Sequence, residues 1–188
     1  EIAQCLVGSE MCIRDRRTRL TDEEVIARCP WATTGRTHHR TPNIITSLEL
    51  DPAEMEKRNI HLQKKYAEIE ENEVRFEELH CEDAEYLIVA FGSCARIAQK
   101  AMEMAREEGI KVGLLRPITL WPFPSKAIAA RAAQVKGILT VELNAGQMVE
   151  DVRLAVECKV PVEHFGRLGG IVPDPDEVIT ALKEKLIK

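Results

Sequence analysis

The chain has 188 residues, of which 45% are hydrophobic and 30% are charged, and its formal net charge at pH 7 is −5. This length and hydrophobic content suffice for one well-buried core with an appendage. The acidic balance argues against a nucleic-acid-binding surface, for which a basic stripe is the expected footprint, and no apolar run reaches the roughly 18 to 20 residues that span a bilayer.

The first sixteen residues, EIAQCLVGSEMCIRDR, share no pattern with the rest of the chain. The run CLVGSEMCIRDR closely resembles a translated sequencing-adaptor artefact of the kind seen at the ends of fragmentary proteins. We therefore expect residues 1–16 to be non-native, with the true N-terminal portion missing, and exclude them from fold reasoning. A short strand around Cys5–Val7 is the alternative.

Residues 17–48 are irregular apart from one short helix. Thr21 or Asp22 is a suitable N-cap for it, and acidic residues follow in the first turn. The helix should end by Cys29, because Pro30 forces the residue before it out of the helical region. The adjacent histidines of the following loop, at positions 38 and 39, are not expected to bind a metal, because neighbouring histidines rarely face one ion.

A long polar helix is predicted from Asp51 to about Leu79, within a linker covering residues 49–80. Asp51 is a good N-cap, and Pro52 occupies the first helical position, where proline is favoured. A narrow apolar stripe recurs at mostly helical spacing; its members are Met55, Leu62, Tyr66 and Ile69. The stripe is short and broken, which favours a connecting helix on a domain or partner surface over a free coiled coil.

From Glu85 onward, continuously apolar segments alternate with amphipathic ones. The predicted strands are Tyr86–Phe91, Ile110–Leu115, Lys136–Leu143 and Val160–Phe165. The predicted helices are Ala95–Glu108, Ser125–Val135, Gly146–Val156 and Pro173–Leu186. Buried strands alternating with helices predict an α/β fold, with an open, mainly parallel sheet covered by helices on both faces, over residues 81–188.

Polar turns follow the predicted strands, and the carboxyl ends of parallel strands are where such sheets meet ligands. The candidate cofactor-binding residues in these turns are Gly92, Ser93, Arg116, Asn144 and Gln147. Gly92 could instead serve only a tight turn, and Arg116 could merely cap the end of its strand. Cys94, near a helix N-terminus, could have a lowered pKa. Glu142 ends an apolar strand and should need a polar partner.

The turn RPITLWPFP, residues 116–124, contains three prolines and two aromatic residues. Rigid aromatic anchors lose little entropy on docking, so this turn and the later NAGQM loop are candidate assembly surface. The predicted interface residues are Trp121, Pro122, Phe123 and Met148. The alternative is that the proline-rich turn packs back on its own sheet.

The chemistry-bearing residues form no Ser/His/Asp set, carboxylate pair or metal-ligand cluster in the sequence, so we assign no catalytic and no metal-binding residue. Six cysteines occur without a Cys-x-x-Cys pair, and the N-terminus lacks a signal-peptide pattern. We expect free thiols in a cytoplasmic protein, and no iron–sulfur cluster held by this chain alone.

Four segments together carry a family resemblance: AFGS, EEGIKVGLLRPITLWPFP, VELNAGQMVEDVRLAV and GRLGGIVPDPDEV. They resemble the second domain of the core, alpha-type subunit of 2-oxoacid:ferredoxin oxidoreductases. The resemblance covers about residues 30–188, including NIITSLELDP and the helix EKRNIHLQKKYAEIEENE. The B-type subunits of ketoisovalerate (3-methyl-2-oxobutanoate) ferredoxin reductases are most similar, followed by the alpha subunits of 2-oxoglutarate:ferredoxin reductases.

The resemblance implies a thiamine-diphosphate-dependent enzyme that oxidatively decarboxylates a branched-chain 2-oxoacid to an acyl-CoA and passes electrons through iron–sulfur clusters to ferredoxin. Residues 17–48 would be the tail of a pyrimidine-binding thiamine domain. Residues 81–188 would be domain II, which resembles the transketolase C-terminal domain and serves assembly. No matched position is a catalytic residue, so the chain should be inactive without the other subunits.

Two other interpretations remain open from the residues. The Gly92–Ala95 turn fits a stand-alone flavodoxin-like module that binds CoA or another phosphate-bearing ligand, which would predict ligand binding by the isolated chain. The same domain also occurs in transketolases and 2-oxoacid dehydrogenases. A neighbouring gene for a ferredoxin-like subunit, rather than a lipoyl transferase, would favour the oxidoreductase.

Overall fold

The computed structural model describes residues 21–28 and 48–187. The chain divides into two compact units, Glu1–Gln63 and Lys64–Lys188, and each is described by itself. The proposed non-native segment 1–16, the histidines at positions 38 and 39, and most of the stretch 17–48 lie outside the described residues.

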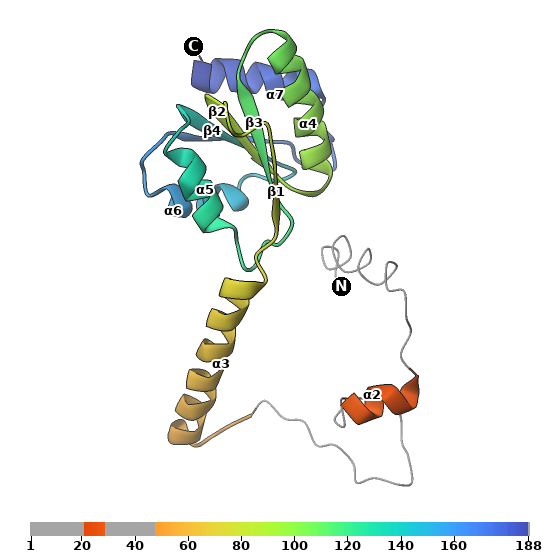
Figure 1. Cartoon of the computed structure of the whole chain (residues 1–188), viewed down its shortest axis with the longest axis vertical. Coiled ribbons are helices and arrows are strands. Elements are labelled where there is room, and N and C mark those ends of the chain that lie inside the picture. Colours follow the sequence, from red (N-terminus) through yellow and green to blue (C-terminus); the bar gives the residue numbers. More distant parts are fainter. Residues whose placement is uncertain (1–20, 29–47, 188) are drawn as a thin grey trace. The chain divides into compact units, whose positions relative to one another are not determined.

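The first unit contains the short helix α2, Asp22–Arg28 (Figure 1). The N–H of Glu24 donates to Oγ1 of Thr21 at 3.3 Å, and the N–H of Thr21 donates to Oε2 of Glu24 at 2.8 Å. This reciprocal pair is a capping box, so Thr21 is the N-cap, as predicted.

Helix α3 runs from Pro52 to Asn72. Oδ1 of Asp51 accepts hydrogen bonds from the N–H groups of Ala53 and Glu54, at 2.8 and 3.4 Å, which confirms the predicted start. The predicted end at Leu79 is wrong. All side chains of α3 are described, and none of them is buried. No core packing against the described residues therefore stabilises a longer helix.

The segment after α3 pairs with the sheet instead of continuing the helix. Phe76–Leu79 form strand β1, which pairs antiparallel with β3. Just before it, the N–H of Arg75 donates to Oγ1 of Thr119 at 3.0 Å, and the carbonyl of Arg75 accepts from the N–H of Ile118 at 2.9 Å. These contacts across more than 40 residues outweigh the local helical pattern of the Glu-rich sequence.

The second unit is built on a sheet with the strand order β1-β3-β2-β4-β5. Strands β3, β2, β4 and β5 are parallel, and only β1 among the described strands is antiparallel. The other strand bounds are Tyr86–Ala90 for β2, Val112–Pro117 for β3, Gly137–Glu142 for β4 and Val162–Gly166 for β5. The predicted open, mainly parallel sheet is confirmed.

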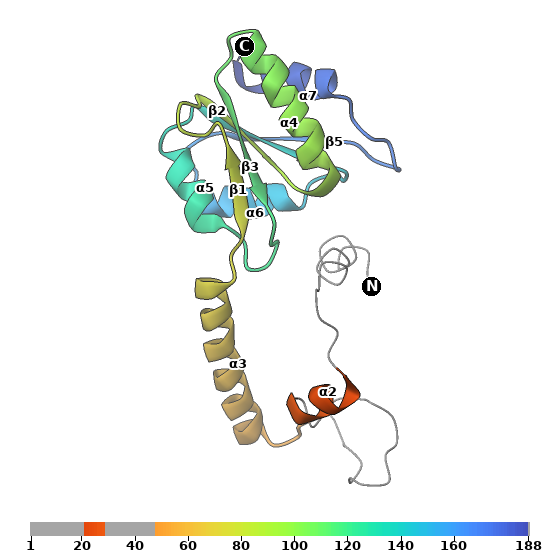
Figure 2. The same ribbon diagram turned by 45° about the vertical axis from the view of Figure 1, so that its right-hand side comes forward.

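Helices cover both faces of this sheet (Figures 1 and 2). Their bounds are Gly92–Glu107 for α4, Ser125–Ala132 for α5, Met148–Val156 for α6 and Pro175–Leu182 for α7, which continues into the π-helix η1, Lys183–Ile187. Residues of α4 and α7 share one buried cluster, and residues of α5 and α6 share the other. Each predicted helix of this unit is therefore present, with ends that shift by a few residues.

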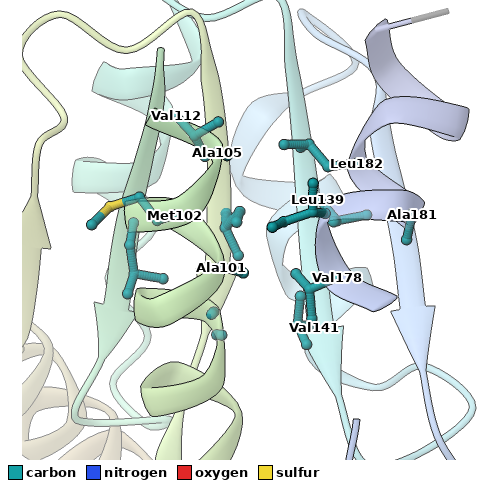
Figure 3. Packing of buried hydrophobic residues seen from close by; sticks show 14 of the residues in the cluster. Ala101, Met102, Ala105, Val112, Leu139, Val141, Val178, Ala181 and Leu182 are labelled. Atoms are coloured by element: carbon teal, nitrogen blue, oxygen red, sulfur yellow. The ribbon is translucent and has the colours of Figure 1, made fainter. Parts of the chain in front are cut away.

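Small side chains let α4 approach the sheet closely (Figure 3). Ala101 and Ala105 are almost fully buried against strand residues such as Leu139 and Val141, while Val178 and Leu182 of α7 fill the neighbouring space. Successive strand residues point to opposite faces. Because both faces are covered, β4 is buried along its whole length, which explains its largely apolar sequence.

Candidate functional site

The candidate site lies at the carboxyl ends of β2 and β4, which are neighbours in the sheet. From β2 the chain passes through α4 to β3 on one side, and from β4 it passes through α6 to β5 on the other. The two helices also lie on opposite faces. This is the topological switch point of an open α/β sheet, where ligand crevices form.

Four of the five predicted cofactor-binding residues follow these two strands. Gly92 and Ser93 follow β2 after one intervening residue, and Asn144 and Gln147 come after β4. Arg116 lies instead in β3, one strand further along, where its Nη1 donates to Oε2 of Glu77 in β1 at 2.9 Å. The Arg116 side chain is therefore committed to pairing with the neighbouring strand.

The N-terminus of α4 is not capped by a side chain of the described residues. Its N-cap residue, Phe91, is extended, and Gly92 has a φ of 56°, a left-handed conformation that glycine adopts readily. The helix thus starts at Gly92 rather than at the predicted Ala95. Backbone N–H groups in a first turn have no intrahelical partner, so this end is polar and positive in character.

The turn after β4 is organised by a buried carboxylate. Glu142, only 1% exposed, ends β4 and accepts three backbone hydrogen bonds from the start of α6. Oε2 accepts from the N–H groups of Gln147 at 3.2 Å and Met148 at 2.9 Å, and Oε1 accepts from Val149 at 3.0 Å. The predicted need for a polar partner is confirmed, and the chain's own carboxylate fills the anion position at this helix N-terminus.

The polar side chains of the turn are bonded to one another. Oδ1 of Asn144 accepts from the N–H of Gly146 at 2.7 Å, and Nδ2 of Asn144 donates to Oε1 of Gln147 at 3.4 Å. Gln147 is exposed and Asn144 is half-buried. These contacts stabilise the turn itself, so the two amides have less hydrogen-bonding capacity for a ligand than the sequence alone indicates.

His164 completes this network, and it was not predicted from the sequence. Its Nδ1 lies 3.3 Å from Oγ1 of Thr140 and 3.5 Å from Oε1 of Glu142, and its Nε2 lies 3.3 Å from the carbonyl oxygen of Asn144. The register pairs Thr140 of β4 with His164 of β5. The signal that could have revealed the contact was the polar residues inside the two predicted strands: Thr140 in β4, and Glu163 and His164 in β5.

The expectation of a lowered pKa for Cys94 is wrong. Burial, together with the negative charge of Glu142, raises the pKa of the Cys94 thiol to about 11. Desolvation disfavours the thiolate more strongly than the helix N-terminus favours it. Cys94 is therefore a buried structural thiol.

The proline-rich turn between β3 and α5 is divided between surface and core. Trp121 is 56% exposed, and its ring meets that of Tyr66 edge to face, with ring centroids 5.5 Å apart. Pro122 is buried, and Phe123 packs partly buried against the core on the α5 side. Pro122 and Phe123 thus pack on the core of their own domain, as the alternative predicts, whereas the docking role of Trp121 stays a prediction.

The position of Met148 differs from the prediction of an interface residue. Met148 is the first residue of α6 and lies in the buried cluster formed by α5, α6 and the sheet. The hydrogen bond from its N–H to Glu142 fixes the helix start so that the side chain points into the core. Met148 therefore does not form part of the domain surface.

Among the described residues, no group of three or more His, Cys, Asp or Glu side chains is placed to hold a metal ion. The described helices also include none that is long and apolar enough to cross a membrane.

Comparison with known proteins decides the family. The family described as pyruvate:ferredoxin oxidoreductase core domain II matches residues 84–178, which include the whole switch point. The chain belongs to this family. Its relatives include the ketoisovalerate oxidoreductase subunit VorB of Methanothermobacter thermautotrophicus, which is 46% identical over 165 residues, or 86% of this chain and 46% of that subunit. The chain thus spans about half the length of the curated relatives it matches.

Solved structures agree with this membership of the core domain II family. A 2-oxoglutarate:ferredoxin oxidoreductase from Magnetococcus marinus, with 2-oxoglutarate, coenzyme A and succinyl-CoA bound, is 25% identical, with a TM-score of 0.66 over 79% of this chain and 28% of that chain. A split-gene transketolase, solved as an inactive tetramer, is 21% identical, with a TM-score of 0.52 over 60% of this chain and 41% of that chain. The second match concerns the fold alone, and it confirms the predicted transketolase-like α/β architecture.

Proposed function

We propose that the chain is part of a subunit of a thiamine-diphosphate-dependent 2-oxoacid:ferredoxin oxidoreductase. The enzyme would oxidatively decarboxylate a branched-chain 2-oxoacid to an acyl-CoA and pass the electrons to ferredoxin. The observation that carries this proposal is the 46% identity with a ketoisovalerate oxidoreductase subunit over 86% of the chain. Relatives named 2-oxoglutarate synthase subunits are 31–35% identical, which supports the branched-chain substrate class.

Within this enzyme, the domain built on the five-stranded sheet would serve assembly. Two features of the described residues support this role: the polar groups after β4 are bonded to one another, and an exposed tryptophan projects from the rigid turn before α5. The partners would be the other subunits, with ferredoxin reached through the complex in the cytoplasm. Neither a nucleic acid nor a membrane forms part of the proposal.

The same assignment divides the chain into parts. Residues 17–48 would be the tail of a pyrimidine-binding thiamine domain, and α3 would link it to domain II. The linker was predicted to reach residue 80, but β1 is a strand of the main sheet. We therefore take domain II to begin at Phe76, the first residue of β1.

The cofactors of the enzyme would be held at the level of the complex. An iron–sulfur cluster usually needs four clustered thiolates, whereas Cys81 and Cys94 are buried in separate core clusters and Cys158 is exposed. The three cysteines of the described part therefore do not fit such a cluster, and no catalytic step is assigned to the described residues.

The experiment that tests this proposal is reconstitution. The complete subunit, co-expressed with its partner subunits, should yield a complex that reduces a viologen dye when supplied with CoA and 3-methyl-2-oxobutanoate. Rates with 2-oxoglutarate, pyruvate and phenylglyoxylate give the substrate preference. Faster turnover of one of these would reassign the substrate, and failure of any 2-oxoacid to support reduction by an assembled complex would contradict the proposed reaction.

One observation favours a second function, a stand-alone module that binds CoA through its phosphates. The N-terminus of α4 has no side-chain cap among the described residues and lies at the switch point. Calorimetric titration of the 188-residue chain with CoA distinguishes the two. Saturable binding by the isolated chain would support the module, whereas the assembly role predicts none.

A further inference from the structure

Exposed apolar side chains gather at one edge of the sheet, the edge formed by the carboxyl ends of its parallel strands. Among the described residues of the second unit, ten large hydrophobic side chains are exposed, and seven of them lie in the segments that follow β3, β4 and β5. Two others reach the same edge: Phe76 pairs with Pro117 at the end of β3, and the ring of Tyr66 contacts that of Trp121. Of the ten, only Leu154, on α6, lies away from this edge.

The opposite edge of the sheet is charged. Each connection that lies there contains acidic or basic residues; these connections are residues 80–85, 108–111, 133–136 and 157–161. None of the exposed large hydrophobic side chains of the described residues lies in them. Ion pairs lie at this edge instead, and they join Asp83 with Arg106, Glu85 with Lys136, and Glu108 with Lys183. The charged edge therefore has the composition of a solvated surface.

The loops of the apolar edge carry no charge. Residues 118–124 after β3, 143–147 after β4 and 168–173 after β5 contain neither an acidic nor a basic side chain. The polar groups near the end of β4 are bonded within their own turn, where Glu142 and Asn144 accept backbone hydrogen bonds. Depletion of charge together with apolar and aromatic residues is typical of the core of a protein–protein interface. A phosphate-bearing ligand, by contrast, would find no cation in these loops.

The loop after β5 presents its apolar side chains on a defined turn. Gly169 and Gly170 have φ values of 65° and 83°. The N–H of Ile171 donates to the carbonyl of Leu168 at 3.3 Å, which closes a β-turn whose two central residues are left-handed, as glycine allows. A Cβ atom added at either glycine would meet nothing within 4 Å, so the turn stands clear of the rest of the domain (Figure 2). The side chains of Leu168, Ile171 and Val172 are 52–61% exposed.

The base of this turn is held by the domain. The N–H of Arg167 donates to the carbonyl of Glu142 at 3.2 Å, and the Arg167 guanidinium pairs with Glu177 of α7, also at 3.2 Å. An apolar group that is already ordered loses little entropy on docking. The turn after β5 therefore meets the same requirement for an interface anchor as the turn that carries Trp121.

We propose that the Leu168–Val172 turn is a second docking anchor, and that it forms one face with the Trp121 turn that binds an apolar, uncharged surface of a partner subunit. The proposal rests on the proposed function, which supplies the partner subunits. Leu143, exposed after β4, lies between the two turns in the strand order and makes the face continuous. The facing surface is uncharged, because a charged group against these loops would lose its water without gaining an ion pair.

The first test uses the complete subunit, co-expressed with its partner subunits. The double variant Leu168→Ser, Ile171→Ser removes two exposed apolar side chains and keeps the backbone of the turn, so its thermal unfolding should stay close to that of the wild type. We expect the yield of copurified partner subunits to fall by about fivefold or more. The matched control, Leu154→Ser, changes an exposed leucine away from the face and should keep the wild-type yield. Wild-type yield with the double variant overturns the proposal.

Hydroxyl-radical footprinting of the wild type shows what covers the face, without any variant. Oxidation of Leu168, Ile171 and Trp121 should fall by about threefold or more when the complete subunit assembles with its partners, while Leu154 is unchanged. Protection that is already present in the complete subunit alone would assign the face to the rest of that subunit. Protection that rises with the concentration of the 188-residue chain would assign it to a second copy. Either result, or no protection in the complex, overturns the proposal.

The docking face and the proposed function fail in different ways. A complex that reduces the dye with a 2-oxoacid, but retains the double variant at wild-type yield and leaves the turn unprotected, overturns the docking face alone. An assembled complex that reduces no dye with any 2-oxoacid contradicts the proposed reaction, while yield and protection still decide the face. If the partner subunits do not copurify with the wild type, the docking face is overturned as well.

Discussion

The guanidinium group of Arg131 forms a two-pronged ion pair with the carboxylate of Glu78, through Nε at 2.9 Å and Nη2 at 2.6 Å. Arg131 lies in α5 and Glu78 in the edge strand β1, and both side chains are largely shielded from water, at 20% and 22% exposure. The pair therefore ties the sheet edge to a helix on one face. Its hydrogen bonds also raise the pKa of Arg131 further above its ordinary value.

Replacing Glu78 with Ala should lower the free energy of unfolding by about 1–2 kcal/mol, because paired guanidinium–carboxylate hydrogen bonds are stronger than neutral ones and Arg131 would lose both. Urea denaturation measures the change. The matched control is Glu71→Ala, which removes the highly exposed pair with Lys126 and should change stability by less than about 0.5 kcal/mol. Equal effects of the two variants would show that β1 is not held by this pair.

The same contacts explain why β1 could not be predicted from the sequence. The residues EENEVRFEEL continue the charged pattern of α3 without a glycine or proline to end it. The strand forms because the backbone N–H of Arg75 donates a hydrogen bond to the distant Thr119 side chain and because Glu78 forms an ion pair with Arg131. The central parallel strands β2, β3 and β4, by contrast, were predictable, because burial on both faces leaves a largely apolar run in each of them.

Replacing Trp121 with Ala in the complete subunit should weaken copurification with the partner subunits while leaving the circular dichroism spectrum nearly unchanged. The large exposed ring on a rigid turn is the kind of anchor that loses little entropy on docking. Pull-down yield of the partners measures the effect. Wild-type yield with Trp121→Ala would contradict the docking role.

Two controls separate docking from internal packing. Tyr66→Ala removes the edge-to-face ring contact with Trp121; if it lowers the yield as much as Trp121→Ala does, the ring pair acts within the subunit. Leu154→Ala trims another exposed apolar side chain, on α6, and should leave the yield unchanged.

Replacing Gly166 with Ala should destabilise the domain by about 1–3 kcal/mol, because the added methyl carbon would lie 2.1 Å from the carbonyl oxygen of Asn144 and 2.6 Å from Nε2 of His164. Thermal and urea unfolding measure the loss. Gly137→Ala is the control: its methyl group would meet only the flexible end of Leu186, at 2.7 Å, and should cost less. If Gly166→Ala is as stable as Gly137→Ala, the turn that contains Asn144 must shift to accommodate the methyl group at little cost in stability.

The polar residues of the turn after β4 were only partly predictable from the sequence. Asn144, Gln147 and Glu142 were identified because polar residues after an apolar strand stand out along the chain. Their use inside the turn was not predictable, since it depends on His164, which comes 20 residues after Asn144 and faces the turn only through the parallel register of β4 and β5. The residue types of the turn are visible in the local sequence, but their hydrogen-bonding partners are determined by the fold.

Two buried thiols make stability sensitive to alkaline pH. Burial, and then the charge of Glu78, raises the pKa of Cys81 to about 11, and burial with Glu142 does the same for Cys94, from an ordinary value of 9.0. Cys81 also directs its thiol toward the carbonyl of Leu114, at 3.4 Å. The pKa of each thiol is therefore higher in the folded protein than in the unfolded chain. The free energy of unfolding keeps its full value below about pH 9 and decreases as the pH rises toward about 11.

The free energy of unfolding should therefore fall between about pH 9 and pH 10.5, by an amount on the order of 1–2 kcal/mol for each thiol, because unfolding lets both ionise. Urea denaturation at several pH values across this range measures the slope. Cys81→Ala and Cys94→Ala lower stability near neutral pH by removing core volume, but each should flatten the alkaline slope, since the ionisable group is gone. Cys158→Ala, at an exposed thiol, should keep the wild-type slope. If all three variants retain that slope, the alkaline loss comes from lysines or tyrosines, and the two core thiols ionise as readily in the folded chain as in the unfolded one.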